Sequence, residues 1–187
     1  MACPKTKLIK ATATCPNLAP GLVKLFLAEQ KWLDTVPDPE DYYTNNSLKP
    51  LTITGDITLD TATYADAKWI QWNIQPNKNG YEPVSQGETG ARYWQTSIPF
   101  MIAGLDPAID QAVDWALNAK LVAIGELRSG KRIFIGDKTN FLEMTQGNGN
   151  SGKATGDFVG WDLILQLPAH NILSPYYEGA LTPVDAL

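Results

Sequence analysis

The sequence has few of the residues that catalysis and metal binding use. Its 187 residues contain one histidine, His170, and two cysteines, Cys3 and Cys15. Ser-His-acid and Cys-His catalysis need a histidine or another base beside the nucleophile, and no Gly-x-Ser-x-Gly elbow occurs. Two cysteines and one distant histidine cannot form a closed zinc site with the usual ligand spacings. We therefore expect a protein that is not an enzyme, with no catalytic, cofactor-binding or metal-binding residues.

The cysteines and the lack of long apolar runs also bear on where the protein is found. Cys3 and Cys15 lie twelve positions apart and are interpreted either as reduced thiols or as a disulfide within an N-terminal arm. No apolar run approaches the roughly 20 residues that span a membrane. The first residues lack the apolar core of a signal peptide. We expect a protein that is made in a cytoplasm and has no membrane partner.

Positive charge is scarce as well. The chain has 15 Lys and Arg against 20 Asp and Glu, a formal net charge of −5, and charged residues make up only 19%. A protein that binds duplexes would carry a basic excess to neutralise phosphates, so specific nucleic-acid binding is not expected. The acidity favours either simple solubility or a surface past which DNA moves without binding, since like charges repel.

What the sequence has in quantity is short alternating segments separated by glycine and proline. Apolar residues make up 44%, and there are 15 Gly, 13 Pro and 6 Trp. Alternation with a period of two predicts about eight strands joined by turns. They fall at residues 22–28, 51–59, 68–75, 92–102, 121–127, 132–136, 140–145 and 158–167. Residues 22–28 are apolar on both faces, which predicts a central strand.

One helix is predicted among the strands, at about residues 106–120. Asp106 is a favoured N-cap, and Pro107 suits the first helical position. An apolar stripe at helical spacing then faces the sheet: Ile109, Val113, Ala116 and Leu117. The sequence therefore predicts a β-rich fold (α+β by count), a β-sandwich or barrel with one flanking helix.

The chain is predicted to be a single domain over residues 1–187. Residues 1–19 are interpreted as an N-terminal arm and residues 20–167 as the β-rich core. Within the core, the Pro-rich segment 34–50 is predicted to be an extended loop. Residues 168–187, which also contain prolines, are interpreted as a peripheral C-terminal arm.

Two long loops and several tryptophans are the candidate sites of contact between subunits. The loops are predicted at residues 76–90 and 146–154, and long loops in compact domains are commonly functional. Aromatic side chains on polar strand faces can anchor protein contacts, although they can equally cover the core. The candidate contacts are Trp69, Tyr81, Val84, Glu88, Trp94, Asn148, Asn150 and Lys153.

Two further patterns bear on other kinds of chemistry. Residues 147–153 match the glycine and lysine spacing of a phosphate-binding loop, but Ala154 stands where Ser or Thr would hold magnesium. A strand, not a helix, is predicted to follow, which favours a hairpin loop. Acidic pairs and tryptophans also leave open a glycosidase with two carboxylates or a carbohydrate-binding module.

Several segments, taken in order, resemble one family. They are Pro20-Gly-Leu-Val-Lys-Leu-Phe-Leu-Ala28, Gly90-Ala-Arg-Tyr-Trp-Gln-Thr-Ser-Ile-Pro-Phe100, Leu121-Val-Ala-Ile, Phe141-Leu-Glu-Met-Thr-Gln-Gly and Thr155-Gly-Asp-Phe-Val-Gly-Trp-Asp-Leu-Ile-Leu. Together they resemble a family of virion proteins of Bacteroidetes phages and prophages, which is similar to phage tail tube proteins.

The resemblance implies a structural virion protein, assembled in the cytoplasm of the bacterial host. Its subunits would form rings, commonly hexamers, that stack into a tube. Its partners would be copies of itself and other virion proteins, with genomic DNA only in passage. The segments 34–50 and 168–187 depart from the family pattern and leave open a tail terminator, neck, baseplate or head-decoration protein. A β-sandwich module that binds carbohydrate or a host surface is the alternative outside virion assembly.

Overall fold

The structure is a computed structural model that describes residues 21–38, 51–75, 78–181 and 184–186. Its elements, in chain order, are β1 (Leu22–Glu29), a 3-10 helix (Gln30–Trp32), β2 (Leu33–Thr35), β3 (Thr52–Ile53), β4 (Thr58–Leu59), β5 (Trp69–Trp72), β6 (Glu82–Gln86), β7 (Tyr93–Ala103), α1 (Pro107–Asn118), β8 (Leu121–Leu127), β9 (Arg132–Ile135), β10 (Glu143–Asn150), β11 (Gly160–His170), β12 (Tyr176–Tyr177) and β13 (Val184–Ala186). The prediction of a β-rich sandwich with one flanking helix is confirmed.

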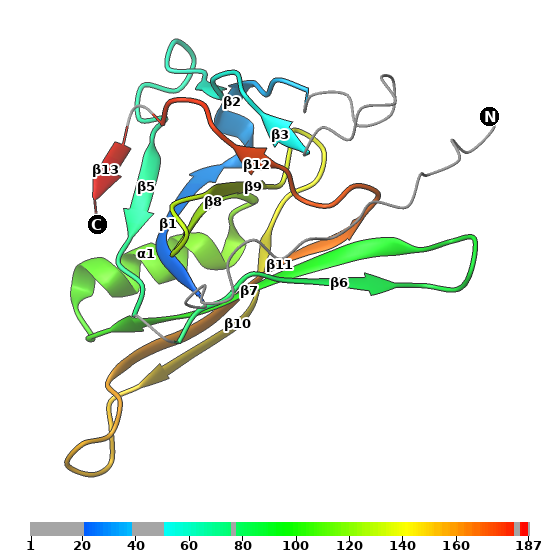
Figure 1. Cartoon of the computed structure of the whole chain (residues 1–187). Helices are drawn as coiled ribbons and strands as arrows, with labels where there is room; N and C mark the ends of the chain where they lie inside the picture. Colours follow the sequence, from blue (N-terminus) through cyan, green and yellow to red (C-terminus); the bar gives the residue numbers. More distant parts are fainter. Residues whose placement is uncertain (1–20, 39–50, 76–77, 182–183, 187) are drawn as a thin grey trace.

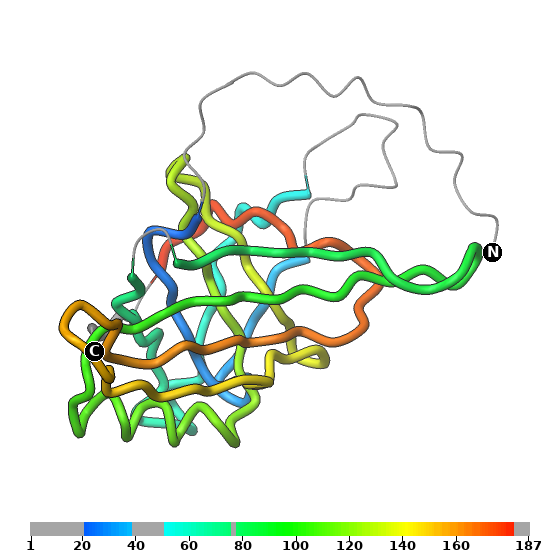
Figure 2. The backbone as a smooth tube through the Cα atoms, turned by 90° about the horizontal axis from the view of Figure 1, so that it is seen from below, coloured from blue at the N-terminus to red at the C-terminus, as the bar shows by residue number. Residues whose placement is uncertain are grey.

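Two sheets form the layers of the sandwich. The larger has seven strands in the order β13-β5-β1-β8-β9-β12-β3, and the smaller has four in the order β10-β11-β7-β6. The main core lies between them and includes Leu25, Trp72, Phe100 and Leu165, all at most 1% exposed. In Figure 2 the four-stranded sheet lies in front of the larger sheet, and α1 lies beside β10.

The seven-stranded sheet is covered on its other face too. A second core is formed there by Phe26, Trp69, Ile124, Phe134 and further buried side chains, including some from the chain between β2 and β5. Strands β1 and β8 are therefore buried on both faces, and the predicted central strand at residues 22–28 is confirmed.

The side chains of β1 do not alternate regularly at the start of the strand. Regular alternation would place Val23 on the same face as Leu25 and Leu27. The pairing of β1 with β8 instead shifts register between Leu22 and Lys24. A bulge adds one residue and reverses the alternation, so Leu22 is buried and Val23 is 48% exposed.

The helix begins where the sequence predicted. The Asp106 carboxylate accepts a hydrogen bond from the Ala108 amide at 2.9 Å, which caps the first turn. Ile109, Val113 and Ala116 pack into the main core. The prediction for Leu117 is wrong, because this side chain is 53% exposed. The partly buried Ala112 packs against the core instead.

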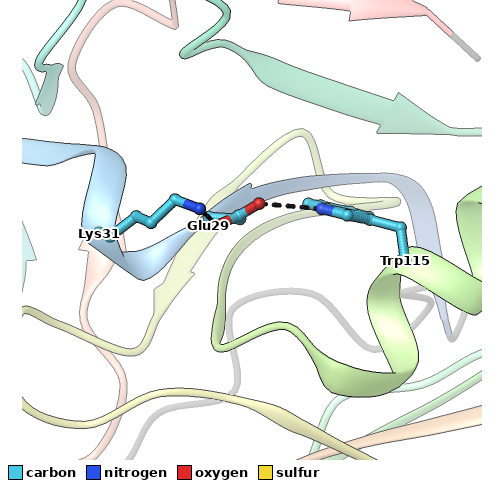
Figure 3. A network of polar contacts seen from close by, with 3 residues as sticks. All are labelled: Glu29, Lys31 and Trp115. Atoms are coloured by element: carbon cyan, nitrogen blue, oxygen red, sulfur yellow. Dashed lines mark hydrogen bonds and ion pairs between the residues drawn. The ribbon is translucent and has the colours of Figure 1, made fainter. Parts of the chain in front are cut away.

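Trp115 attaches the helix to the seven-stranded sheet. Its ring stacks on Trp32, with 6.3 Å between ring centroids. Its indole N–H donates to the carboxylate of Glu29 at 2.9 Å, and the same carboxylate forms an ion pair with Lys31 (Figure 3). The helix is therefore held at the end of β1 by both packing and a charge-assisted hydrogen bond.

Two further predictions are corrected by the sheet topology. Residues 51–59 form β3 and β4, which belong to different sheets, and not one strand. The C-terminal segment is not a peripheral arm, because β11 continues to His170 and both β12 and β13 pair within the seven-stranded sheet. The predicted arm 1–19 and most of the predicted loop 34–50 lie outside the described residues.

Candidate assembly surface

The four-stranded sheet has one buried face and one face directed to solvent. On β7 the buried side chains are Thr96, Ile98, Phe100 and Ile102, and their partners on β11 include Leu163, Leu165 and Leu167. The alternate residues of both strands point outward. The registers with β6 and β10 extend the outward face across all four strands: Glu82, Val84, Gln86, Gln95, Ser97, Pro99, Met101, Glu143, Gln146, Asn148, Asp162, Ile164 and Gln166.

This outward face has no cation. Strands β6, β7, β10 and β11 contain no Lys or Arg at any position. Their charged residues are the acids Glu82, Glu143 and Asp162, set among amides and small side chains. The amide of Gln86 donates to that of Gln95 at 2.7 Å, so some of the polar groups bond to one another. The face is therefore polar, weakly acidic and unsuited to holding phosphates.

Two hairpin arms extend the sheet beyond the core. The arm formed by β6 and β7 projects from one end of the molecule, and the arm formed by β10 and β11 projects from the opposite end (Figures 1 and 2). In the tight turn of the first arm, Gly87 has φ +93°, and a Cβ atom there would lie 2.4 Å from the carbonyl oxygen of Ala91. Only glycine fits this position without a shift of the turn.

The tip of the second arm is closed by its own carboxylate. The amides of Lys153 and Ala154 each donate to Asp157 at 2.8 Å. These two backbone hydrogen bonds lower the pKa of Asp157. The amides that would hold a phosphate are thus bonded within the hairpin, and a strand follows the tip, as the sequence predicted.

Each of the two predicted loops contains part of a strand. Residues 76–90 contain β6, and residues 146–154 contain the second half of β10. The prediction is wrong for these strand residues, among which Pro83, Gly147 and Gly149 lie in edge strands and not in irregular chain. The described residues of these regions that lie outside strands are 78–81 and the two tips, 87–92 and 151–159.

The candidate contact residues fall on the two arms, except Trp69, and Tyr81 lies at the base of the first arm. Val84 and Glu88 are exposed on the first arm, where Trp94 is half-buried. Asn148, Asn150 and Lys153 are exposed on the second arm. The two groups lie at opposite ends of the sheet and do not form one patch.

Trp69 is the exception, and the prediction that it lies on a polar surface is wrong. Its side chain is 0% exposed in the second core. Residues distant in sequence, among them Ile57 and Tyr177, cover the face that the local alternation marks as polar.

Hydrogen bonding fixes which backbone groups of β6 face the open edge. The Gly80 amide donates to the Pro99 carbonyl at 3.0 Å. In an antiparallel pair the groups facing the partner alternate along the strand. Residues 82, 84 and 86 therefore face β7. Tyr81, Pro83 and Ser85 direct their backbone groups to the free edge, and Pro83 has no N–H to offer there.

The same reasoning places the free groups of β10. The Gly104 amide donates to the Val159 carbonyl at 2.9 Å, in register with the pairing of β7 and β11. Gln146 and Asn148 then bond to β11. Gly147 and Gly149 direct their amides and carbonyls to the other edge of the sheet. Among the described residues, both edges of the four-stranded sheet thus carry backbone groups that no neighbouring strand pairs, and these can pair with another chain.

Tyr81 links the first arm to the core. Its side chain is half-buried against the main core, and neither its hydroxyl nor that of Ser174 has a hydrogen-bond partner of normal geometry among the described residues. Burial raises the pKa of Tyr81, and the nearby hydroxyls of Ser174 and Thr96 oppose part of the rise. Tyr81 is therefore a packing residue at the base of the arm more than a free contact.

The single histidine lies at the edge of a cleft. The cleft has a volume of about 490 Å³ and is lined by apolar side chains such as Ile53, Phe134 and Leu167, together with His170 and Asp137. The His170 ring contacts the Pro168 carbonyl at 3.0 Å and the Thr96 hydroxyl at 3.4 Å. Asp137 bonds to its own turn, not to the histidine. The two side chains are therefore not arranged as a base with its orienting acid.

Within the described ranges, no group of three or more His, Cys, Asp and Glu side chains is placed to hold a metal ion. No described helix is long and apolar enough to cross a membrane. Comparison with known proteins finds no matching family model, curated protein or solved structure.

Proposed function

We propose that this chain is a structural virion protein of the tail-tube type, which assembles with copies of itself into rings that stack into a tube conducting DNA. The observation that carries the proposal is the cation-free outward face of the four-stranded sheet. A channel for DNA needs a wall that does not bind phosphates, and this face offers acids and amides without one Lys or Arg.

The strand directions support ring formation. Each neighbouring pair in the order β10-β11-β7-β6 is antiparallel, so the two edge strands run in opposite directions. When a second copy is placed beside the first by rotation about an axis near the strand direction, its β10 lies antiparallel to β6. Such a head-to-tail contact can repeat until the ring closes. The sheet then continues from copy to copy, and its free edges disappear.

In such a ring the cation-free face lines the channel, and the seven-stranded sheet lies outside. The two arms extend along the axis from opposite ends of each subunit, where they reach the rings above and below. We propose a hexameric ring, as the resemblance implies, with other virion proteins at the ends of the tube. The site of assembly is the cytoplasm of the bacterial host, and the assembled protein belongs to the virion.

Negative-stain electron microscopy of the concentrated protein tests the proposal. Rings or tubes are expected from the unmodified chain. Ser85→Pro removes an edge N–H that faces away from β7, so it should abolish rings without unfolding the subunit. Dispersed monomers of the unmodified chain at every concentration would contradict the proposal and favour a module that binds carbohydrate or a host surface.

A further inference from the structure

The free edge of β6 is open to two kinds of partner strand in a second copy. One is β10, which generates the ring. The other is β6 itself, because two copies of one edge can pair antiparallel about a two-fold axis and close into a dimer. A two-fold dimer would bury the edge that ring growth requires.

We propose that Pro83 is a specificity-determining residue that disfavours the two-fold β6 dimer and so keeps this edge available for β10. The inference rests on the proposed function and concerns the choice of partner at the same edge. It follows from the direction in which the Pro83 nitrogen points. Because the Gly80 amide bonds to β7, the positions that face the free edge are Tyr81, Pro83 and Ser85.

The cost of the missing N–H differs between the two pairings. In a two-fold pairing, Pro83 occurs once in each copy, so two intermolecular hydrogen bonds are lost. When the register centres on Pro83, these are both bonds of the central pair. In the β6–β10 pairing only one is lost, because Gly147 and Gly149 keep their amides and the Pro83 carbonyl still accepts. Proline at this position therefore penalises the closed dimer more than the ring contact.

The position of Pro83 in the sheet shows which residues could replace it. Pro83 lies on the inward side of β6, opposite the buried Thr96, and is half-buried. Proline in a sheet is confined to edge strands, with its nitrogen directed away from the ladder. A β-branched residue would fit this strand as well and would supply the donor. Threonine is therefore the direct replacement, and alanine is a second one of smaller volume.

Pro99 provides a matched control within the same sheet. It pairs with Gly80 in the continuation of the β6–β7 register, and its nitrogen points to β6 and not to a free edge. Pro99→Thr makes the same chemical change as Pro83→Thr but adds an N–H inside the molecule. Any effect that is general to replacing proline appears in both variants.

Sedimentation equilibrium at concentrations below those that give rings measures the dimer. Pro83→Thr, and Pro83→Ala if the first variant folds poorly, should lower the dimer dissociation constant by roughly 10- to 100-fold relative to the unmodified chain. Pro99→Thr should leave it unchanged. The double variant Pro83→Thr with Ser85→Pro should return to monomer, because the second change removes a donor of the same edge.

The outcomes separate this inference from the proposed function. Rings from the unmodified chain, with no dimer from either Pro83 variant, would overturn the role of Pro83 alone. A dimer that persists in the double variant would also overturn it, since the contact would then lie elsewhere. If the unmodified chain forms no rings while Pro83→Thr dimerises through β6, the role of Pro83 holds and the ring proposal fails.

Discussion

The two sheets of this molecule use the same kind of strand for different purposes. In the seven-stranded sheet, β1 and β8 are buried on both faces, and the sheet contains cations such as Lys24 and Arg132. In the four-stranded sheet, only one face is buried, and no strand contains Lys or Arg. The comparison shows a division: one sheet holds the fold together, and the other presents a surface and two edges.

The arms sharpen this contrast. Strands β7 and β11 have 11 residues each. On β6 only Pro83 is half-buried, and the other four residues are exposed. Arms with so little buried area add little to stability. We therefore attribute the length of these arms to the proposed contacts with other copies of the chain.

The largest expected effect is in the doubly covered sheet. Trp69→Ala removes a fully buried side chain from the second core and should lower the free energy of unfolding by about 3–5 kcal/mol. Val84→Ala, on the exposed edge strand, should change it by less than about 0.5 kcal/mol. Urea unfolding followed by fluorescence measures both. Similar losses in the two variants would remove the division between the sheets.

The next effect separates neighbouring residues of one strand. Val84 donates its amide to β7, whereas the Ser85 amide faces the free edge. Val84→Pro should cost about 1–3 kcal/mol, because it breaks a ladder hydrogen bond. Ser85→Pro should cost less than about 0.5 kcal/mol and yet prevent ring formation. Thermal melting and electron microscopy of the two variants test this prediction. An equal loss of stability in both would show that the residues of β6 assigned to face β7 and the free edge are the wrong ones.

Signals from residues close in sequence explain which parts of the fold could be predicted. Residues 22–28 are apolar at nearly every position, and a strand of that kind must be covered on both sides. The helix begins at Asp106 because the cap and Pro107 are local signals. Both predictions depend only on residues close in sequence, and both are confirmed.

Prediction from the sequence failed where residues distant in the chain determine the surroundings of a side chain. Trp69 lies on a face with polar neighbours, and only the folded chain brings Ile57 and Tyr177 over it. Strands β12 and β13 are 2 and 3 residues long, too short to show a period. Pro83 made β6 look like a loop, although an edge strand tolerates proline where the nitrogen faces outward.

Part of the candidate site could have been predicted more fully. Apart from Arg92 at its first position, the strand expected at 92–102 has no Lys or Arg, and neither have the strand expected at 158–167 or residues 82–86 and 143–150. The sequence shows this absence of Lys and Arg. It does not show that the four segments form one face, because only the strand order places them side by side.

Lysines added to the outward face of the four-stranded sheet should make this face bind DNA. Replacing Gln95, Gln146 and Gln166 by lysine should create duplex binding whose affinity falls roughly 40-fold between 50 and 200 mM salt, as three neutralised phosphates predict. Lysines at Thr89, Ser129 and Thr155 give the same net charge on scattered turns and serve as the control. Fluorescence anisotropy compares the two sets. Equal binding by both would show that net charge matters and the arrangement of this face does not.

The smallest expected effect lies in the turn between β9 and β10, where the chain passes from one sheet to the other. Burial raises the pKa of Asp137, but hydrogen bonds from the side chains and amides of Thr139 and Asn140 outweigh it and hold the pKa below its ordinary value of 3.8. The Asn140 amide donates to this carboxylate at 2.7 Å and its side chain at 2.8 Å.

A carboxylate whose pKa is lower in the folded state stabilises the fold above its unfolded pKa, and the contribution is lost as pH falls through the folded pKa. The free energy of unfolding of the unmodified chain should therefore exceed that of Asp137→Asn at pH 6, by less than about 1 kcal/mol because the group is partly exposed. The difference should shrink as pH falls below about 4. Thr139→Val, which removes one donor, should lose a smaller part of it. Urea unfolding at pH 6, 4 and 3 provides the comparison. If the difference stays constant down to pH 3, the Asp137 charge does not stabilise the turn, and the connection between the sheets depends on packing alone.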